Sequence, residues 1–252
     1  MNPVPITSVR ACAGRFRSCA ATHVGTVRTR NEDNFVNRPD LGIWAVADGA
    51  GGHQAGEVAS QMVTDALAEV PPGLGAAELL AEVRLRILQA HDAIRAEAAR
   101  RGAHAILATT IVALLAHRDY FACLWAGDSR AYLLREGALT LVSHDHSLVQ
   151  ELVDAGALTP EEALTHPRSN VITRAVGHKD YVQVDTADID ITVGDRLLLC
   201  SDGLHGYFTS DKEVVELCSD GPLDECAEAA LALANQRGGK DNITAVVIEV
   251  QE

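Results

Sequence analysis

Four short β-rich segments follow one another in the middle of the chain with no helical segment between them. They are Thr110–Leu115, Tyr120–Ala126, Ala131–Arg135 and Ala138–Val142. A few polar or glycine residues, such as Arg135-Glu-Gly137, separate neighbouring segments, which is typical of antiparallel hairpins. Strands that do not alternate one-for-one with helices fit a doubly wound parallel sheet poorly. We therefore predict an antiparallel sheet at the centre of the fold.

Helical periodicity lies on both sides of this strand run. Helices are predicted at Gly56–Val70, Ala76–Arg100 and Leu223–Ala234. Further strands are predicted at Phe16–Ala21, Ile43–Ala47, Arg196–Cys200 and Ile243–Val250. In the first helix, Val58, Met62, Ala66 and Val70 recur at four-residue steps and are expected to mark its buried face. The order of strands and helices predicts an antiparallel α+β layered fold.

Residues 144–180 form a polar insert between core strands. One short helix is expected at Ser147–Ala155, and Thr159-Pro-Glu-Glu is typical of the start of another. A polar insert of this kind is where a mobile flap is expected.

Length and charge narrow the choice of function. The chain has 252 residues and a formal net charge of −14, so one domain with a full core is expected. The negative charge argues against nucleic acid as a partner and against anionic membranes, because such binding needs clustered Lys and Arg. No apolar run approaches the ~20 residues of a spanning helix, and residues 1–21 contain no apolar signal segment. We therefore expect a cytoplasmic protein without membrane insertion.

The six cysteines contain no CxxC pair. Cys123 and Cys200 lie inside apolar strand-like runs, where a reduced, buried thiol is the ordinary state. A disulfide framework is not expected.

Five short acidic segments place aspartates next to predicted strands. Their aspartates are Asp33 (preceded by Glu32), Asp48, Asp128, Asp202 and Asp241. An aspartate at a strand end is usually a turn former. Clustered carboxylates repel one another unless a positive charge lies between them. If these side chains converge, a pair of hard divalent cations is expected between them, and the protein is then a hydrolase acting on phosphate.

Other chemistries are less well supported. Three glycines follow Asp48 within four residues, but GxGxxG fails at Gln54 and no Gly-Lys-Ser/Thr is present, so a nucleotide loop is not expected. No G-x-S-x-G elbow surrounds Ser129 or Ser201, which argues against a nucleophilic serine. His144-Asp145-His146 has no further His or Cys at useful spacing, so we interpret it as the polar start of the insert.

An ordered set of motifs resembles a known family. The motifs are VRxxNED, DGxGGHxxGExAS, ATT, GDSRxYLLRxG, TPEEA, HPxxNxITRAxG, LLLCSDGL and GGKDN. Together they resemble the metal-dependent Ser/Thr protein phosphatases of type 2C (PPM), in the compact bacterial form, from about Ala21 to Val250. The resemblance implies a four-layer αββα sandwich, with two antiparallel sheets flanked by helices and a flap at about residues 144–180.

The resemblance also implies roles for single residues. Asp48 would bridge two Mn²⁺ or Mg²⁺ ions, with the Gly49 carbonyl as a further ligand; Asp202 and Asp241 would complete one site, and Glu32 and Asp33 would serve the other. Asp128 with Asp202 would hold a weaker third metal. Arg28 would bind the substrate phosphate, although Arg30 would lie on the same side if the segment were a strand.

The sequence departs from the family pattern at two positions. Ala50 replaces a His proposed to protonate the leaving group in many eukaryotic members, and His53 is a weak substitute. Gly206 stands where some members have a further metal-binding Asp, which puts the third metal in doubt. Asn170 falls on the flap motif and is a candidate contact of the substrate or of the third metal.

These observations lead to one function hypothesis with two alternatives. We predict a monomeric protein phosphatase that hydrolyses phosphoserine and phosphothreonine with two Mn²⁺ or Mg²⁺ ions. Its partners would be phosphorylated proteins, a cognate Ser/Thr kinase among them, by family analogy. The alternatives are a pseudophosphatase that acts as a binding module and a two-metal nuclease or small-phosphoester hydrolase.

Overall fold

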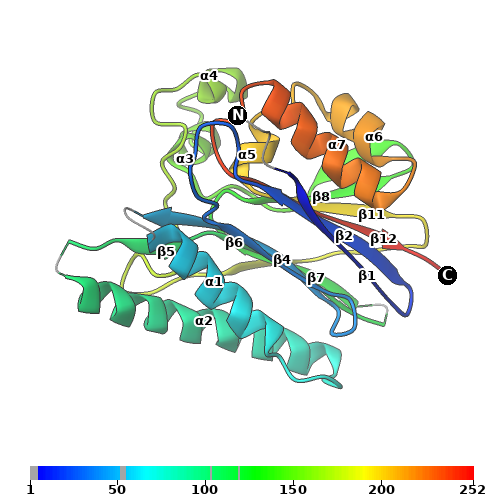
Figure 1. Cartoon of the computed structure of the whole chain (residues 1–252), viewed down its shortest axis with the longest axis horizontal. Coiled ribbons are helices and arrows are strands. Elements are labelled where there is room, and N and C mark those ends of the chain that lie inside the picture. The colour runs from blue at the N-terminus through cyan, green and yellow to red at the C-terminus, as the bar shows by residue number, and fades with distance from the viewer. Residues whose placement is uncertain (1–4, 52–54, 103, 119) are drawn as a thin grey trace.

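The computed structural model describes residues 5–51, 55–102, 104–118 and 120–252, and contains two antiparallel sheets packed face to face (Figure 1). Sheet I consists, in spatial order, of β1 (Thr7–Ala13), β2 (Phe16–His23), β12 (Ile243–Val250), β11 (Arg196–Cys200), β8 (Arg130–Arg135) and β9 (Ala138–Leu141). Sheet II consists of β10 (Asp185–Asp188), β7 (Tyr120–Ala126), β6 (Ile111–His117), β4 (Ile43–Gly51) and β3 (Asp33–Arg38), and β5 (Leu107–Thr109) pairs with β4. The predicted antiparallel sheet architecture is therefore confirmed.

Helices cover both outer faces. The outer face of sheet II is covered by α1 (Ala55–Ala68) and α2 (Ala76–Arg101). The outer face of sheet I is covered by α5 (Asp202–His205), α6 (Asp211–Cys218) and α7 (Leu223–Gln236). Two short helices, α3 (Leu148–Asp154) and α4 (Pro160–Leu164), belong to the insert and bury no residue.

Three apolar layers hold the fold together. Trp44 and Phe121 belong to the layer between the two sheets, where Phe16 packs edge-on against both rings. Val63 and Ile87 belong to the layer between sheet II and its helices, and Leu231 belongs to the layer under α7. Because removing apolar surface from water is the main driving force of folding, these layers fix the stacking order. The order is helix, sheet, sheet, helix, as the family resemblance implied.

The hairpin prediction was right for two connections and wrong for a third. β6 pairs with β7, and β8 pairs with β9 through Glu136 and Gly137, both at positive φ as a two-residue hairpin turn requires. β7 and β8, however, belong to different sheets. The segment Gly127–Ser129 therefore passes from one sheet to the other, which carries Asp128 to the common end of both sheets.

Several elements differ from the sequence prediction. β1, β3, β5 and β10 were not predicted. The fully buried face of α1 carries Ala59, Val63 and Leu67, whereas the predicted Val58, Met62 and Ala66 are only partly buried; Val70 is buried but lies beyond the end of the helix. Asp33 begins β3 and Asp48 lies within β4, so neither ends a strand.

All six cysteines are free thiols. Within the described part of the chain, no helix has the length and apolar character needed to cross a membrane.

Candidate metal centre

Asp33 and Asp48 face each other across two neighbouring strands of sheet II. They are direct partners in the β3–β4 ladder, so their side chains leave the sheet on the same face. Unbalanced like charges directly opposite each other destabilise a sheet. The pair therefore indicates a binding site for a positively charged group between the two carboxylates.

The backbone around Asp48 is held firmly. Its amide N–H donates to Thr110 Oγ1 at 3.0 Å, and its carbonyl accepts from the Thr110 amide at 2.8 Å and from Thr109 Oγ1 at 3.0 Å. The next residue must be glycine, because a Cβ on Gly49 would lie 2.2 Å from the carbonyl oxygen of Gly56. The close approach of α1 to β4 thus explains the Asp-Gly pair at this point.

Sheet I contributes its own aspartates at the same end of the fold. Asp202 begins α5 directly after β11, and Asp241 lies just before β12. Ser201 Oγ donates to Asp33 Oδ2 at 2.8 Å and accepts from the Thr244 amide at 3.0 Å, which ties the two sheets together.

Asn242 connects the loops that carry the acidic residues. Its side-chain Oδ1 accepts from the Glu32 amide at 2.7 Å, and its Nδ2 donates to the carbonyls of Val24 and Arg30 at 2.9 and 2.8 Å. The GGKDN motif contained this residue, but sequence reasoning gave it no role, and it gave none to Thr110 or Ser201 as a support for the aspartates. Each of these contacts spans more than 60 positions, so no local pattern could have revealed it.

The carboxylates perturb one another strongly. Burial raises the pKa of Asp33 to about 7, and the negative charges of Asp202 and Asp241 add to this rise. The hydrogen bond from Ser201 acts in the opposite direction and lowers the pKa. Burial and the charges of Asp33 and Asp202 raise the pKa of Asp48 well above its usual range. Burial and the charge of Asp241 also raise the pKa of Asp202. The five aspartates predicted from sequence therefore share one electrostatic environment, since Asp128 acts on Asp48 as well.

The donors at this site fit hard divalent cations. Asp33 Oδ1 and Asp202 Oδ1 are buried and have no hydrogen-bond partner among the described residues. Buried acceptors without a donor are costly, and carboxylate and carbonyl oxygens are the ligands that Mg²⁺ and Mn²⁺ prefer. Across the described ranges, no three His, Cys, Asp or Glu residues already form a ligand cluster. The carboxylates of the described residues thus surround a common region, but no three of them are close enough to form a ligand cluster.

Asp128 lies next to this group, on the crossing from β7 to β8. Burial and the charge of Asp202 raise its pKa to about 8. Its backbone carbonyl is 3.0 Å from His205 Nε2, and burial lowers the pKa of His205 to about 4. A neutral His205 therefore anchors the Asp128 backbone to α5.

Arg28 and Arg30 point to different partners. Arg28 Nη2 lies 2.8 Å from Asp241 Oδ2, whereas Arg30 Nη1 lies 3.5 Å from Glu57 Oε2. Partial burial alone would lower the pKa of Arg28. The hydrogen bond to Asp241 and the negative charges of Asp241, Glu32 and Asp48 outweigh this effect and raise the pKa. Residues 24–32 are not a strand, so the alternation that would have placed both arginines on one side does not apply.

The remaining candidates have separate environments. His144 contacts Asp154, Asp145 contacts Arg130, and His146 contacts Asp185. These three residues therefore do not converge as one metal site.

Ala50 is exposed, and His53 and Gln54 lie outside the described residues. Asn170 accepts a hydrogen bond from Ser169 at 3.2 Å. A Cβ on Gly206 would lie 2.9 Å from the Asp202 carbonyl oxygen, so an Asp there would need a local shift.

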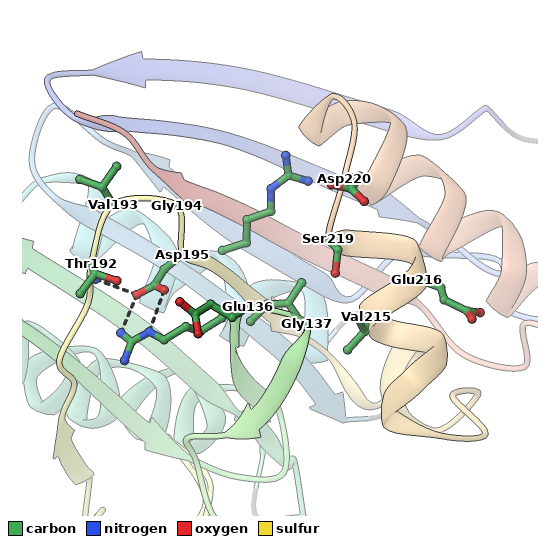
Figure 2. A pocket seen from close by; sticks show the side chains of 13 residues that line it. Glu136, Gly137, Thr192, Val193, Gly194, Asp195, Val215, Glu216, Ser219 and Asp220 are labelled. Carbon is green, nitrogen blue, oxygen red and sulfur yellow. Dashed lines mark hydrogen bonds and ion pairs between the residues drawn. The ribbon is translucent and has the colours of Figure 1, made fainter.

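A large open cavity of about 640 Å³ lies elsewhere, at the opposite end of β11 from Asp202 (Figure 2). On its wall, Asp195 accepts from Arg135 at 2.7 and 2.9 Å and from the Thr192 amide at 2.7 Å. These groups satisfy one another and contain none of the predicted site residues. The cavity is therefore separate from the acidic centre.

Known proteins resemble the chain over most of its length. The model of the family described as "Protein phosphatase 2C" matches residues 21–232. The serine/threonine protein phosphatase PstP of Mycobacterium tuberculosis is 40% identical over 236 residues, 93% of this chain. The chain spans 45% of the length of that relative.

Two solved structures have the same fold. PppA, described as a key regulatory component of T6SS in Pseudomonas aeruginosa, is 38% identical with a TM-score of 0.87, covering 97% of this chain and 100% of PppA. The catalytic domain of PstP in complex with two manganese ions is 37% identical with a TM-score of 0.78, covering 94% of this chain and 99% of that domain. The chain belongs to the protein phosphatase 2C family.

Proposed function

We propose that this protein hydrolyses phosphoserine and phosphothreonine in proteins at a centre of two Mn²⁺ or Mg²⁺ ions. The observation that carries the proposal is the shared environment of Asp33, Asp48, Asp202 and Asp241, with two buried carboxylate oxygens that lack a hydrogen-bond partner among the described residues. Family membership and the two manganese ions in the related PstP domain support it.

The proposed ligand roles are those that the family resemblance implies for the matching residues. Asp48 would serve both ions, and the Gly49 carbonyl would add a further ligand. Asp202 and Asp241 would complete one site, and Glu32 and Asp33 would serve the other. Asp128 would add a weaker third site with Asp202. When bound, the ions supply a nucleophilic water at neutral pH and neutralise negative charge on the phosphoryl group.

The surrounding residues position the reactants. Arg28, whose side chain is 51% exposed, is free to exchange its Asp241 contact for a phosphate, and its planar fork suits paired phosphate oxygens. Ser201 and Asn242 hold the acidic loops in place. Attack on phosphorus is then in line, without a covalent enzyme intermediate.

The partners follow from the same proposal. We expect phosphorylated proteins as substrates, with a cognate Ser/Thr kinase and its targets among them, and a monomeric cytoplasmic enzyme whose residues 144–180 act as a flap in a single domain. The pseudophosphatase alternative would be favoured by loss of a metal aspartate, but Asp48, Asp202 and Asp241 are all present. A nuclease would need a basic groove, which the acidic centre and the net charge of −14 disfavour.

One assay tests the proposal directly. The purified protein is incubated with a phosphothreonine peptide and Mn²⁺, with and without chelator, beside Asp48→Ala and Asp202→Ala. We expect phosphate release that requires the metal and both aspartates. Activity that survives the chelator and both substitutions would refute the metal mechanism, and an inactive wild-type protein with bound metal would favour a binding module.

A further inference from the structure

A second cavity, of about 260 Å³, lies between α3 and residues 173–183. Its wall carries Arg174 and Lys179. Lys179 is one of three lysines in a chain whose net charge is −14. Two cationic side chains in one small cavity favour the binding of an anionic group.

An ion pair with Asp185 holds one side of the Arg174 guanidinium in place. Nη1 donates to Asp185 Oδ1 at 3.0 Å, and Asp185 is in turn 3.1 Å from His146 Nε2. Asp185 is the partner of Arg174 in the described part of the chain, so the other donors of the fork remain available. An arginine fixed in this way loses little further entropy when it binds a carboxylate.

Lys179 and Thr173 add donors beside Arg174. Lys179 Nζ donates to the Thr173 carbonyl at 2.9 Å, which uses one of its three protons. Thr173 Oγ1 is buried and lacks a hydrogen-bond partner among the residues described. Glu151 on the facing wall is exposed and has the opposite charge, so it weakens the cavity for anions without filling it.

The cavity is connected to the acidic centre through a continuous backbone ladder. Gly49 pairs with Thr109, and Thr109 exchanges two hydrogen bonds of 3.0 and 2.8 Å with Val176. Neighbouring strands lie about 4.8 Å apart, so Val176 is roughly 10 Å from Gly49 and Arg174 lies two residues beyond it. An extended peptide advances about 3.3 Å per residue, so about 10 Å corresponds to roughly three residues, and the two further residues to Arg174 raise the estimate to about five.

We propose that this cavity is a subsite for an acidic side chain of the phosphoprotein substrate. Arg174 and Lys179 bind an Asp or Glu that lies about three to five residues from the phosphorylated residue. The inference rests on the proposed phosphatase function and adds a sequence preference to it. An acidic flank would otherwise be repelled by the negative charge of the protein, and the two cations offset that repulsion.

The experiment compares phosphothreonine peptides that carry Glu or Gln at single positions on either side of the phosphorylated residue. The enzymes are wild type, Lys179→Gln, Glu151→Gln and the control Lys212→Gln, which removes the same charge from α6, where the lysine side chain is 82% exposed. For wild type we expect KM about two- to fivefold lower with Glu than with Gln at one position, and similar kcat. Lys179→Gln should lose this preference, Lys212→Gln should keep it, and Glu151→Gln should increase it.

Equal KM values for Glu and Gln at every position would overturn the inference, as would the same preference in Lys179→Gln and Lys212→Gln. Inorganic phosphate is tested as a free anion on the Gln peptides. Lys179-dependent inhibition by phosphate without any Glu preference would also overturn the inference, because the site would then serve a free anion. Turnover of the Gln peptides reports the phosphatase function separately. If no peptide is turned over, fluorescence anisotropy with the same peptides measures the Glu preference as binding.

Discussion

Ser201 Oγ donates a 2.8 Å hydrogen bond to Asp33 Oδ2 across 168 positions of the chain. Asp33 begins β3 of sheet II, and Ser201 follows β11 of sheet I. Ser201 also accepts from the Thr244 amide on β12, so its hydroxyl orientation is fixed by both sheets. One buried hydroxyl therefore sets the direction in which Asp33 presents its other oxygen, Oδ1, which has no hydrogen-bond partner in the part of the chain that the structure describes.

Ser201→Ala should weaken metal binding more than it weakens folding. The change removes the donor that opposes the raised pKa of Asp33, and it leaves the Thr244 amide without its acceptor. Loss of a partner that orients a metal ligand typically costs 10- to 100-fold in affinity, and we expect about that loss for Mn²⁺ by calorimetric titration. Ser18→Ala removes a hydroxyl that bonds to Asn37, away from the centre, and should leave Mn²⁺ affinity unchanged. Equal affinities in the two variants would contradict the role given to Ser201.

Asp48→Asn should abolish catalysis while preserving the fold. We expect kcat/KM on a phosphothreonine peptide to fall by at least about 100-fold at saturating Mn²⁺. The chelated variant should be at least as heat-stable as chelated wild type, because the substitution removes a carboxyl group whose ionisation is opposed by burial and by the charges of Asp33 and Asp202. Asp40→Asn, which removes an exposed carboxylate paired with Arg38 at 2.7 Å, is the control and should retain activity. A chelated Asp48→Asn protein that unfolds well below wild type would argue against a metal role for Asp48.

The sequence predicted the strands with the strongest apolar runs, and Tyr120–Ala126, Arg196–Cys200 and Ile243–Val250 match the structure to the residue. It missed β1 and β3, because β1 is a largely exposed edge strand and β3, Asp33-Asn-Phe-Val-Asn-Arg38, is mostly polar. Local periodicity carries little signal for such strands, which are fixed by pairing with β2 and β4. The change of sheet at Gly127–Ser129 was missed for the same reason, since a short connection looks like a hairpin whichever sheet follows.

The site residues were predicted by family resemblance, and the structure adds contacts that resemblance alone does not supply. It brings the predicted aspartates into one electrostatic environment. It also distinguishes the two arginines, because Arg28 contacts Asp241 whereas Arg30 contacts Glu57. The supports of the site, Thr110, Ser201 and Asn242, depend on distant pairings that no spacing in the sequence displays.

Arg28→Ala should raise KM for a phosphothreonine peptide by about tenfold or more, because charge-assisted hydrogen bonds to phosphate are among the strong ones. Arg30→Ala should change KM by less than about twofold, since Arg30 points toward Glu57 rather than Asp241. Both are measured by steady-state kinetics at saturating Mn²⁺, because freeing Asp241 from Arg28 also alters a proposed metal ligand. A larger effect of Arg30→Ala would reassign phosphate binding.

The metal-free protein should lose stability as the pH rises. The folded pKa of Asp33 is raised to about 7 from an ordinary value of 3.8. Between these values the folded protein keeps a proton that the unfolded chain has released, so the free energy of unfolding falls as the pH increases through this window. His205, with a folded pKa of about 4, acts in the opposite direction at lower pH, so wild type must be compared with Asp33→Asn, in which His205 is unchanged.

We expect the Tm of chelated wild type to fall between about pH 5 and about pH 8 by roughly 3 °C or more relative to Asp33→Asn. The measurement is thermal unfolding followed by circular dichroism in the presence of chelator. Added Mn²⁺ should remove this difference in slope at neutral pH, because bound cations stabilise the ionised carboxylates that protons otherwise neutralise. Parallel Tm profiles for the two chelated proteins would show that Asp33 does not titrate in this range, and the electrostatic coupling of the centre would then be weaker than its burial indicates.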